Sequence, residues 1–181
     1  LPAEFAHHVG MIALKNNWLP PIPHQEGIAQ GLATTVPGIG DLRHPIGLAA
    51  GFDKNCEALR GLAGLGFSFL ECGTVTPRPQ LGNPKPRLFR QAAERGVINR
   101  MGFNNHGMLT IARRLAHLNW RNDIVPLGVN VGKNKDTPLE KAVGDYTECI
   151  QTLKQYAQYL VINISSPITP WLRSLAQEDF L

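Results

Sequence analysis

Four short apolar runs, separated by segments with helical character, constrain the fold of this chain more than any other feature. The runs cover residues 45–52, 67–76, 123–132 and 159–165. Continuous apolar and β-branched runs are typical of strands that are buried on both faces. Strands that alternate with helices predict a parallel sheet with helical crossovers. An open Rossmann-like sheet and a (β/α)8 barrel both satisfy this order, so the alternation alone leaves the two architectures open.

The segments between the runs have the apolar periodicity of amphipathic helices. Helices are predicted over 55–65 and 106–118, and a third begins at Thr137. For the third, Thr137 is the expected N-cap, Pro138 occupies the first helical position, and Glu140 completes a capping box. Its apolar stripe consists of Leu139, Val143, Tyr146, Ile150, Leu153 and Ala157.

About 40 residues precede the first strand and form a separate helical extension. Residues 3–18 predict a short amphipathic helix, and 25–33 predict a weaker one that contains two glycines. The prolines of 19–23 separate the two helices. These helices either cap the core or anchor the protein at a membrane interface through their apolar side. The expected division is an extension over 1–40 and an α/β domain over 41–181.

Composition excludes several classes of function. The net charge is +4, but the basic residues are dispersed and no nucleic-acid motif is present, so we expect no nucleic-acid partner. Cys56, Cys72 and Cys149 are odd in number and lack C-x-x-C spacing, which argues against a disulfide framework or a zinc site. The six histidines are scattered, are interpreted as surface residues, and predict no metal site. No apolar run approaches the roughly 18 residues that span a bilayer.

Each apolar run ends in small or amide side chains. The four ends are Ala49-Ala50-Gly51, Gly73-Thr74, Asn130-Val131-Gly132 and Asn163-Ile164-Ser165-Ser166. In a β/α barrel the active site lies at the carboxyl ends of the strands. Small residues let a flat ligand approach the backbone, and amides and hydroxyls suit a heterocycle with C=O and N–H edges. The alternative interpretation is that these residues only begin the loops.

Two further segments carry polar residues of interest. Lys54 follows the first run directly and is either a solvated loop residue or a cation beside an electron-rich ring or a carboxylate, with Asp53 orienting it. Asn99, Asn104 and Asn105 either form turns or read the edges of a planar polar ligand. The segment GVNVGK (128–133) lacks the spacing of a phosphate-binding loop, so no nucleotide motif is predicted.

Five segments in order resemble class 2 dihydroorotate dehydrogenase, the membrane-associated, quinone-linked, FMN-containing enzyme of pyrimidine (UMP) biosynthesis. They are GLAAGFDKN (47–55), ECGTVTPRPQLGNPKPRLFR (71–90), INRMGFNN (98–105), GVNVGKNKDTP (128–138) and INISSP (162–167). The resemblance covers nearly the whole chain, and residues 3–18 resemble the first helix of the family's N-terminal extension. It implies a (β/α)8 TIM barrel of which this chain spans the first four units, since a full barrel needs about 250 residues.

The resemblance also implies the reaction, which is oxidation of dihydroorotate to orotate by FMN, with electrons passing to a quinone that enters between the N-terminal helices. It implies Ser166 as the catalytic base. The implied flavin contacts are Ala50, Gly51, Phe52, Asp53, Lys54, Thr74, Asn130 and Asn163. The implied substrate contacts are Lys54, Asn99, Arg100, Met101, Gly102, Phe103 and Asn163. The expected location is peripheral, at the cytoplasmic face of a bacterial inner membrane or at the mitochondrial inner membrane.

Two positions depart from the family pattern. Ile168 stands where the family has a substrate-contacting Asn, and Trp171 stands where it has Gly. The lost Asn removes a hydrogen bond of about 0.5–1.5 kcal/mol. A second hypothesis therefore accompanies the enzyme assignment: a barrel fragment without activity of its own that acts only through assembly with a partner.

Overall fold

The computed structural model describes residues 1–22, 31–120 and 125–165. Its elements follow the chain in the order α1 (Ala3–Lys15), β1 (Thr34–Val36), β2 (Gly40–Leu42), α3 (Leu59–Ala63), β3 (Leu70–Val75), β4 (Leu88–Gln91), β5 (Gly96–Asn99), α4 (Met108–Leu118), β6 (Leu127–Val131), the 3-10 helix η2 (Leu139–Lys141), α5 (Ala142–Leu153) and β7 (Tyr159–Ile162). Most of the second predicted helix, over 25–33, lies outside the described residues.

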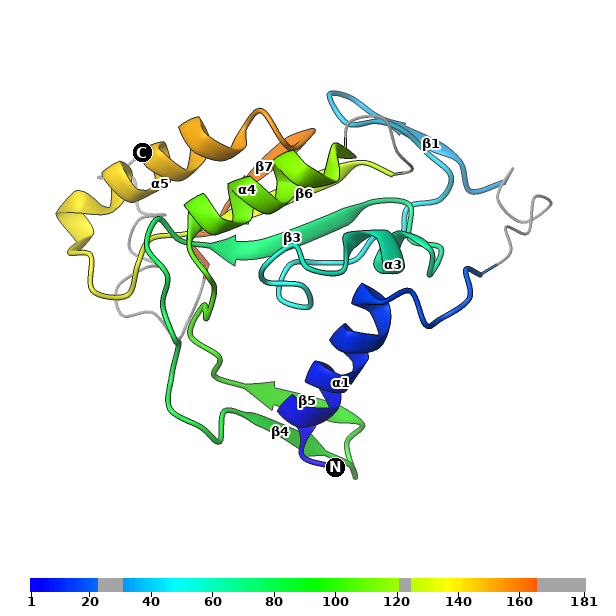
Figure 1. Cartoon of the computed structure of the whole chain (residues 1–181), viewed down its shortest axis with the longest axis horizontal. Coiled ribbons are helices and arrows are strands. Elements are labelled where there is room, and N and C mark those ends of the chain that lie inside the picture. Colours follow the sequence, from blue (N-terminus) through cyan, green and yellow to red (C-terminus); the bar gives the residue numbers. More distant parts are fainter. Residues whose placement is uncertain (23–30, 121–124, 166–181) are drawn as a thin grey trace.

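The central sheet is parallel and decides between the two architectures. Its strands run in the order β3–β6–β7, and a parallel bridge from Leu48 to Leu70 adds the first apolar run beside β3 (Figure 1). Each strand therefore lies next to the one that precedes it in the chain. A doubly wound sheet would reverse its order at a switch point. The observed order is that of a β/α barrel.

Helices cover the outer face of this sheet. The five residues of β6 are all buried, and α4 and α5 lie side by side over the sheet (Figure 1). Ile111 of α4 and Leu153 of α5 are completely buried. Each such side chain contributes about 1.5–3 kcal/mol by leaving water. The prediction of doubly buried strands is confirmed for β6, whereas β7 is only half-buried along its length.

Helix α1 packs on the domain and is held at both ends. At its carboxyl end Leu14 is buried, and its carbonyl lies so close to Gly61 that a Cβ there would approach it to 2.3 Å. At its amino end, Glu4 accepts hydrogen bonds from the buried Arg87 guanidinium at 2.7 and 3.1 Å. These hydrogen bonds hold the pKa of Glu4 below its ordinary value. Within the described residues α1 thus caps the domain, while its apolar side chains Phe5, Val9 and Ile12 stay exposed.

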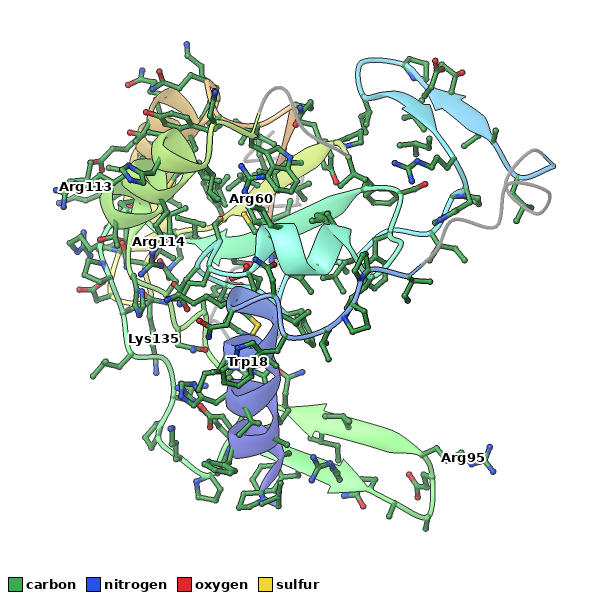
Figure 2. The ribbon with its side chains drawn as sticks, turned by 45° about the vertical axis from the view of Figure 1, so that its right-hand side comes forward. Trp18, Arg60, Arg95, Arg113, Arg114 and Lys135 are labelled. Carbon is green, nitrogen blue, oxygen red and sulfur yellow. The ribbon has the colours of Figure 1, made fainter. Side chains whose placement is uncertain are left out.

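Two antiparallel hairpins were not predicted from the sequence. β1 pairs with β2, and β4 pairs with β5, the latter inside a stretch that reads as a Pro- and Gly-rich loop. Their strands have only three or four residues and are mostly exposed, so no alternation of buried and exposed residues marks them. The β4–β5 hairpin lies beside α1, and Figure 2 shows Arg95 at its turn, pointing away from the rest of the molecule.

The predicted capping box is wrong. A 3-10 turn, η2, precedes α5, which begins at Ala142 with no side-chain cap. The Thr137 hydroxyl instead accepts a hydrogen bond from Arg78, and its carbonyl accepts one from the buried Lys133 ammonium at 2.9 Å. These tertiary contacts override the local capping preference. The apolar stripe also has an exception, since Val143 is exposed.

None of the described helices has the length and apolarity that crossing a membrane would require.

Candidate functional site

A cavity of about 770 Å³ opens where the central strands end. Most of the residues implied by the resemblance line it: Ala50, Gly51, Phe52, Lys54, Thr74, Asn99, Met101, Gly102, Phe103, Asn130 and Asn163. They come from three loops and three strands that are far apart in the sequence. The structure therefore brings the predicted polar strand ends together at one edge of the sheet.

Not every predicted residue lies here. Asp53 and Arg100 are not among the residues that line this cavity, and Ser166 is outside the described residues. Ser165, its neighbour, does line the cavity, and both its N–H and its hydroxyl donate to Asn163 Oδ1 at 3.1 Å. The Arg100 guanidinium turns away and donates to the Pro86 carbonyl at 3.0 Å.

Side chains from three adjacent strands form a hydrogen-bond network in the cavity. Thr74 Oγ1 donates to Asn130 Oδ1 at 2.6 Å and accepts from Asn163 Nδ2 at 3.1 Å. Asn130 Nδ2 then donates to Glu71 Oε1 at 2.9 Å. Each amide is oriented by its partners, because its oxygen and nitrogen contact groups of opposite character. The network presents fixed donors and acceptors without a net positive charge.

Glu71 belongs to this network although no sequence pattern marked it as a candidate site residue. Successive residues of a strand point to opposite faces, so Glu71 and Thr74, three positions apart, should not share one. The register between β3 and β6 shifts between Cys72 and Val75. Within this irregularity Gly73 has φ +113°, and a Cβ on it would lie 2.4 Å from the Asn130 carbonyl oxygen. The irregularity turns both side chains into the cavity.

Lys54 is the cation of the cavity. It is half-buried, and its ammonium donates to the Gly51 carbonyl. Burial lowers the pKa of Lys54, and the nearby Arg87 charge lowers this pKa further, against the opposing effects of Glu4 and Asp53. The positive charge of Lys54 is therefore only partly compensated by its neighbours. An anionic ligand in the cavity would reduce the free-energy cost of burying this charge.

Replacing Lys54 by Met is expected to raise the free energy of unfolding of the ligand-free protein at neutral pH. The lowered pKa of Lys54 means that folding opposes protonation, so stability rises with pH between its folded and unfolded pKa values. The gain from the substitution should shrink as the pH approaches 10.5, the ordinary lysine pKa. Urea unfolding at several pH values measures this, with the exposed Lys141→Met as control. A gain that does not change with pH would contradict the electrostatic origin.

Asp53 has a different place from the one predicted. Its carboxylate is buried and accepts backbone N–H groups from Asn55, Glu57 and Ala58 at 2.8–3.2 Å. Three such bonds satisfy a buried carboxylate and fix the turn that leads into α3. Asp53 thus shapes the loop that carries Lys54, and it attracts the ammonium only at a distance.

Helix α1 contributes two cavity residues that sequence reasoning missed, Glu4 and His7. His7 is partly exposed, but it has partners that the interpretation of the histidines as surface residues did not predict. Its Nε2 lies 2.8 Å from the Phe52 carbonyl oxygen, and its ring meets the Phe52 ring edge-to-face with centroids 5.0 Å apart. No local pattern links a helix residue to a loop 45 positions away, so only the tertiary structure reveals this contact.

A second cavity of about 710 Å³ adjoins the first. It lies between α1, the loop after the first apolar run and the start of β4. Both cavities are lined by Glu4, His7, Phe52, Lys54, Leu88 and Met101. Glu4 and His7 of α1 therefore belong to the wall that the two cavities share.

The asparagines of the amide-rich segment 98–105 lie in different places. Asn99 faces the first cavity, whereas Asn104 lines the second. Asn105 is buried and bonds to Thr76 and to the backbone of its own turn, with Nδ2 donating to the Phe103 carbonyl at 2.8 Å. Asn105 is therefore a turn residue, as one alternative predicted, whereas Asn99 lines the cavity, and its contact with a planar ligand stays a prediction. In the described part of the chain, no three His, Cys, Asp or Glu side chains gather as a metal site would require.

Comparison with known proteins places these observations in a family context. The family model described as dihydroorotate dehydrogenase matches residues 31–181. The dihydroorotate dehydrogenase (quinone) of Myxococcus xanthus (strain DK1622) is 50% identical over 188 residues, which cover 100% of this chain and 51% of that protein. The protein of the same name from Anaeromyxobacter sp. (strain K) is 60% identical over 141 residues, covering 78% of this chain and 39% of that protein.

Solved structures of the same family are also similar to this chain. DHODH from Eimeria tenella in complex with ferulenol superposes with a TM-score of 0.89 and 42% identity, covering 98% of this chain and 47% of that chain. Its ligand-free form gives 0.90 and 43%, with 98% and 49% covered. These likenesses confirm the TIM-barrel fold class. The chain spans about half the length of the curated relatives that cover it fully.

Proposed function

Because this chain belongs to the dihydroorotate dehydrogenase family, we propose that it supplies the N-terminal half of an FMN site at which dihydroorotate is oxidised to orotate and electrons pass to a quinone. The reaction serves pyrimidine biosynthesis. The observation that carries the proposal is the first cavity, where residues from 49–54, 99–103 and three strand ends converge. That convergence was expected from the resemblance and from the strand ends independently.

The donor set of the cavity fits a flavin. Thr74, Asn130 and Asn163 offer oriented hydroxyl and amide groups, which suit the C=O and N–H edges of an isoalloxazine ring. Ala50 and Gly51 leave the backbone open, since a Cβ on Gly51 would meet no atom within 4 Å. Lys54 would stabilise negative charge on a reduced ring. When bound, FMN would supply the acceptor for the hydride that leaves the substrate, which carries both electrons of the oxidation.

The substrate would lie against the same cavity. In this proposal Lys54 pairs with the dihydroorotate carboxylate, while Asn163 and the segment Asn99–Phe103 bind the ring. Ser166 takes the proton from C5. A serine hydroxyl is a poor base, so its own proton must pass to a relay such as a nearby Thr or a chain of waters. Phe103 lines the cavity and would keep bulk water from this path.

The quinone would use the second cavity. It adjoins the first through shared residues and is bounded by α1, so electrons need to cross only one wall. Phe5 of α1 lines it and is exposed, α1 also exposes Val9 and Ile12, and the neighbouring hairpin exposes Val97 and Ile98. An apolar surface at this place supports peripheral membrane contact. The proposed location is the cytoplasmic face of the inner membrane in a bacterium, or the mitochondrial inner membrane in a eukaryote.

The two departures from the family pattern, Ile168 and Trp171, lie outside the described residues. The proposal retains the expected loss of one substrate hydrogen bond at Ile168, about 0.5–1.5 kcal/mol.

Flavin spectroscopy on the protein at its full cellular length tests this function. We expect a yellow protein whose flavin absorbance bleaches when dihydroorotate is added without oxygen and returns when a soluble quinone is added. A colourless protein that takes up no FMN would contradict the flavin site. A yellow protein that dihydroorotate does not bleach would contradict the substrate, because the cofactor would then be present without the reaction.

A further inference from the structure

We propose that Gln80 is a positioning residue for the substrate, and that its side-chain amide holds the Gly102–Phe103 backbone in the conformation that binds dihydroorotate. Gln80 is not among the residues that line the first cavity, and it acts through the segment that does. The inference rests on the proposed function, because it assigns a role toward the same substrate. It adds a residue that the family resemblance did not mark as a site residue.

The contacts of Gln80 are complete on both ends of its amide. Nε2 donates to the Gly102 carbonyl at 3.1 Å and to the Phe103 carbonyl at 3.2 Å. Oε1 accepts from Asn134 Nδ2 at 2.9 Å and from the Lys135 N–H at 3.0 Å. An amide has two donor hydrogens and two acceptor lone pairs, so this one is fully used. Reversing it would place like groups against each other at all four contacts.

The carbonyls that Gln80 binds belong to an unusual backbone. Gly102 has φ +75° and Phe103 has φ +53°, so two successive residues occupy the left-handed region. For a bulky residue such as Phe103 this conformation is strained and persists only where the surroundings hold it. The Phe103 carbonyl also accepts from Asn105 Nδ2, whereas Gln80 is the donor to the Gly102 carbonyl. Gln80 thus stabilises a backbone that would otherwise relax.

The consequence is the position of the Phe103 ring. Phe103 lines the first cavity, and its ring lies beside Gly132, where an added Cβ would come within 3.7 Å of it. Gly102, Met101 and Asn99 line the same wall. A rotation of the 102–103 peptide would move this wall toward or away from the ligand. None of the hydrogen bonds that join Thr74, Asn130 and Asn163 involves Gln80.

The other end of the Gln80 amide is anchored to rigid structure. Asn134 is buried, its backbone N–H donates to Asp145 of α5 at 2.7 Å, and its Oδ1 accepts from the Arg78 N–H at 3.0 Å. Gln80 also pairs through its own backbone with Asn105, at 3.0 Å in both directions. Three loops are therefore tied through one side chain: those after β3, before α4 and after β6.

The test uses Gln80→Glu in the FMN-loaded protein, with orotate as the probe. Glutamate keeps the acceptor that faces Asn134 and Lys135 but puts an oxygen where the donor was. We expect orotate to bind about ten-fold more weakly by flavin absorbance, the effect of one or two lost hydrogen bonds. The KM for dihydroorotate should rise, while flavin content and the KM for quinone stay unchanged and the Tm falls by no more than a few degrees. Gln80→Met, which removes both the donors and the acceptor of the amide without adding charge, should show the same pattern.

The matched control is Gln91→Glu, which makes the same charge change at the exposed end of β4 and should leave orotate binding unchanged. Orotate affinity that is equal in the parent and in both Gln80 variants overturns the inference. So does a loss of flavin in both variants, because the role of Gln80 would then be structural. A parent protein that binds FMN but no orotate would instead overturn the proposed function, and the inference with it.

Discussion

Flavin reduction by dihydroorotate should become about 10²–10⁴-fold slower when Ser166 is replaced by Ala, the usual contribution of a positioned acid or base. The resemblance makes Ser166 the only proposed group that takes the C5 proton. Asn163, which begins the same strand end, lies in the cavity with its amide bonded to Thr74. Flavin binding should be unchanged, because the groups that would hold the ring are on other residues. Stopped-flow absorbance under anaerobic conditions measures the rate.

The neighbouring serine provides the matched comparison. The Ser165 hydroxyl donates to Asn163 Oδ1 at 3.1 Å, so Ser165→Ala removes one hydrogen bond, about 0.5–1.5 kcal/mol, and should slow reduction about ten-fold at most. A Ser166→Ala protein that retains flavin and is reduced at the parent rate would remove Ser166 from the mechanism. Equal losses in the two variants would show that the strand end is merely distorted.

Gly73→Ala should be the most destabilising single substitution in the central sheet. A Cβ at this position would lie 2.4 Å from the Asn130 carbonyl oxygen and 3.0 Å from the Val75 nitrogen, and both atoms are backbone. Forcing such an overlap costs about 1–3 kcal/mol. The positive φ of +113° adds about 1–2 kcal/mol for a residue that has a Cβ. Urea denaturation should show this loss, and FMN affinity should fall as Thr74 and Asn130 separate.

The control for this substitution is Gly144→Ala. Gly144 lies in α5, is exposed, and an added Cβ would meet nothing within 4 Å. Removing a glycine from a helix interior should stabilise the protein by about 0.5–1 kcal/mol. The two variants make the same chemical change, but the free energy of unfolding should fall for Gly73→Ala and rise for Gly144→Ala. If both shift stability alike, the close approach of β3 and β6 at Gly73 is not tight.

The sequence predicted the main elements because the spacing of their apolar residues shows which side chains are buried. The run around β6 is apolar on both faces, and the stripe from Tyr146 to Leu153 follows the helix period, so both elements were found. Thr137 failed as an N-cap because Arg78, distant in the chain, donates to its hydroxyl, and Lys133, four residues earlier, donates to its carbonyl. The hairpin strands β4 and β5 were missed because their exposed residues carry no burial signal.

The site was predictable to the extent that it consists of strand ends. Thr74, Asn130 and Asn163 each follow an apolar run, and the parallel order of the sheet makes their convergence a consequence of topology. Glu71 was not predicted as a site residue, because a register irregularity, and not simple strand alternation, turns its side chain into the cavity. Glu4 and His7 were not predicted as cavity residues because they lie on α1. No local sequence pattern indicates how α1 packs onto the domain.

The neighbour-by-neighbour order of the central sheet has a consequence for synthesis on the ribosome. The chain emerges amino end first, so each new strand finds the edge of the preceding strand already formed. The loop that carries Lys54 is made first, then Thr74, then Asn130 and finally Asn163. The hydrogen bond between Thr74 and Asn130 can form once β6 has been added, whereas those of Asn163 can form only after β7. The complete hydrogen-bond network of the cavity is therefore the last part of this sheet to form.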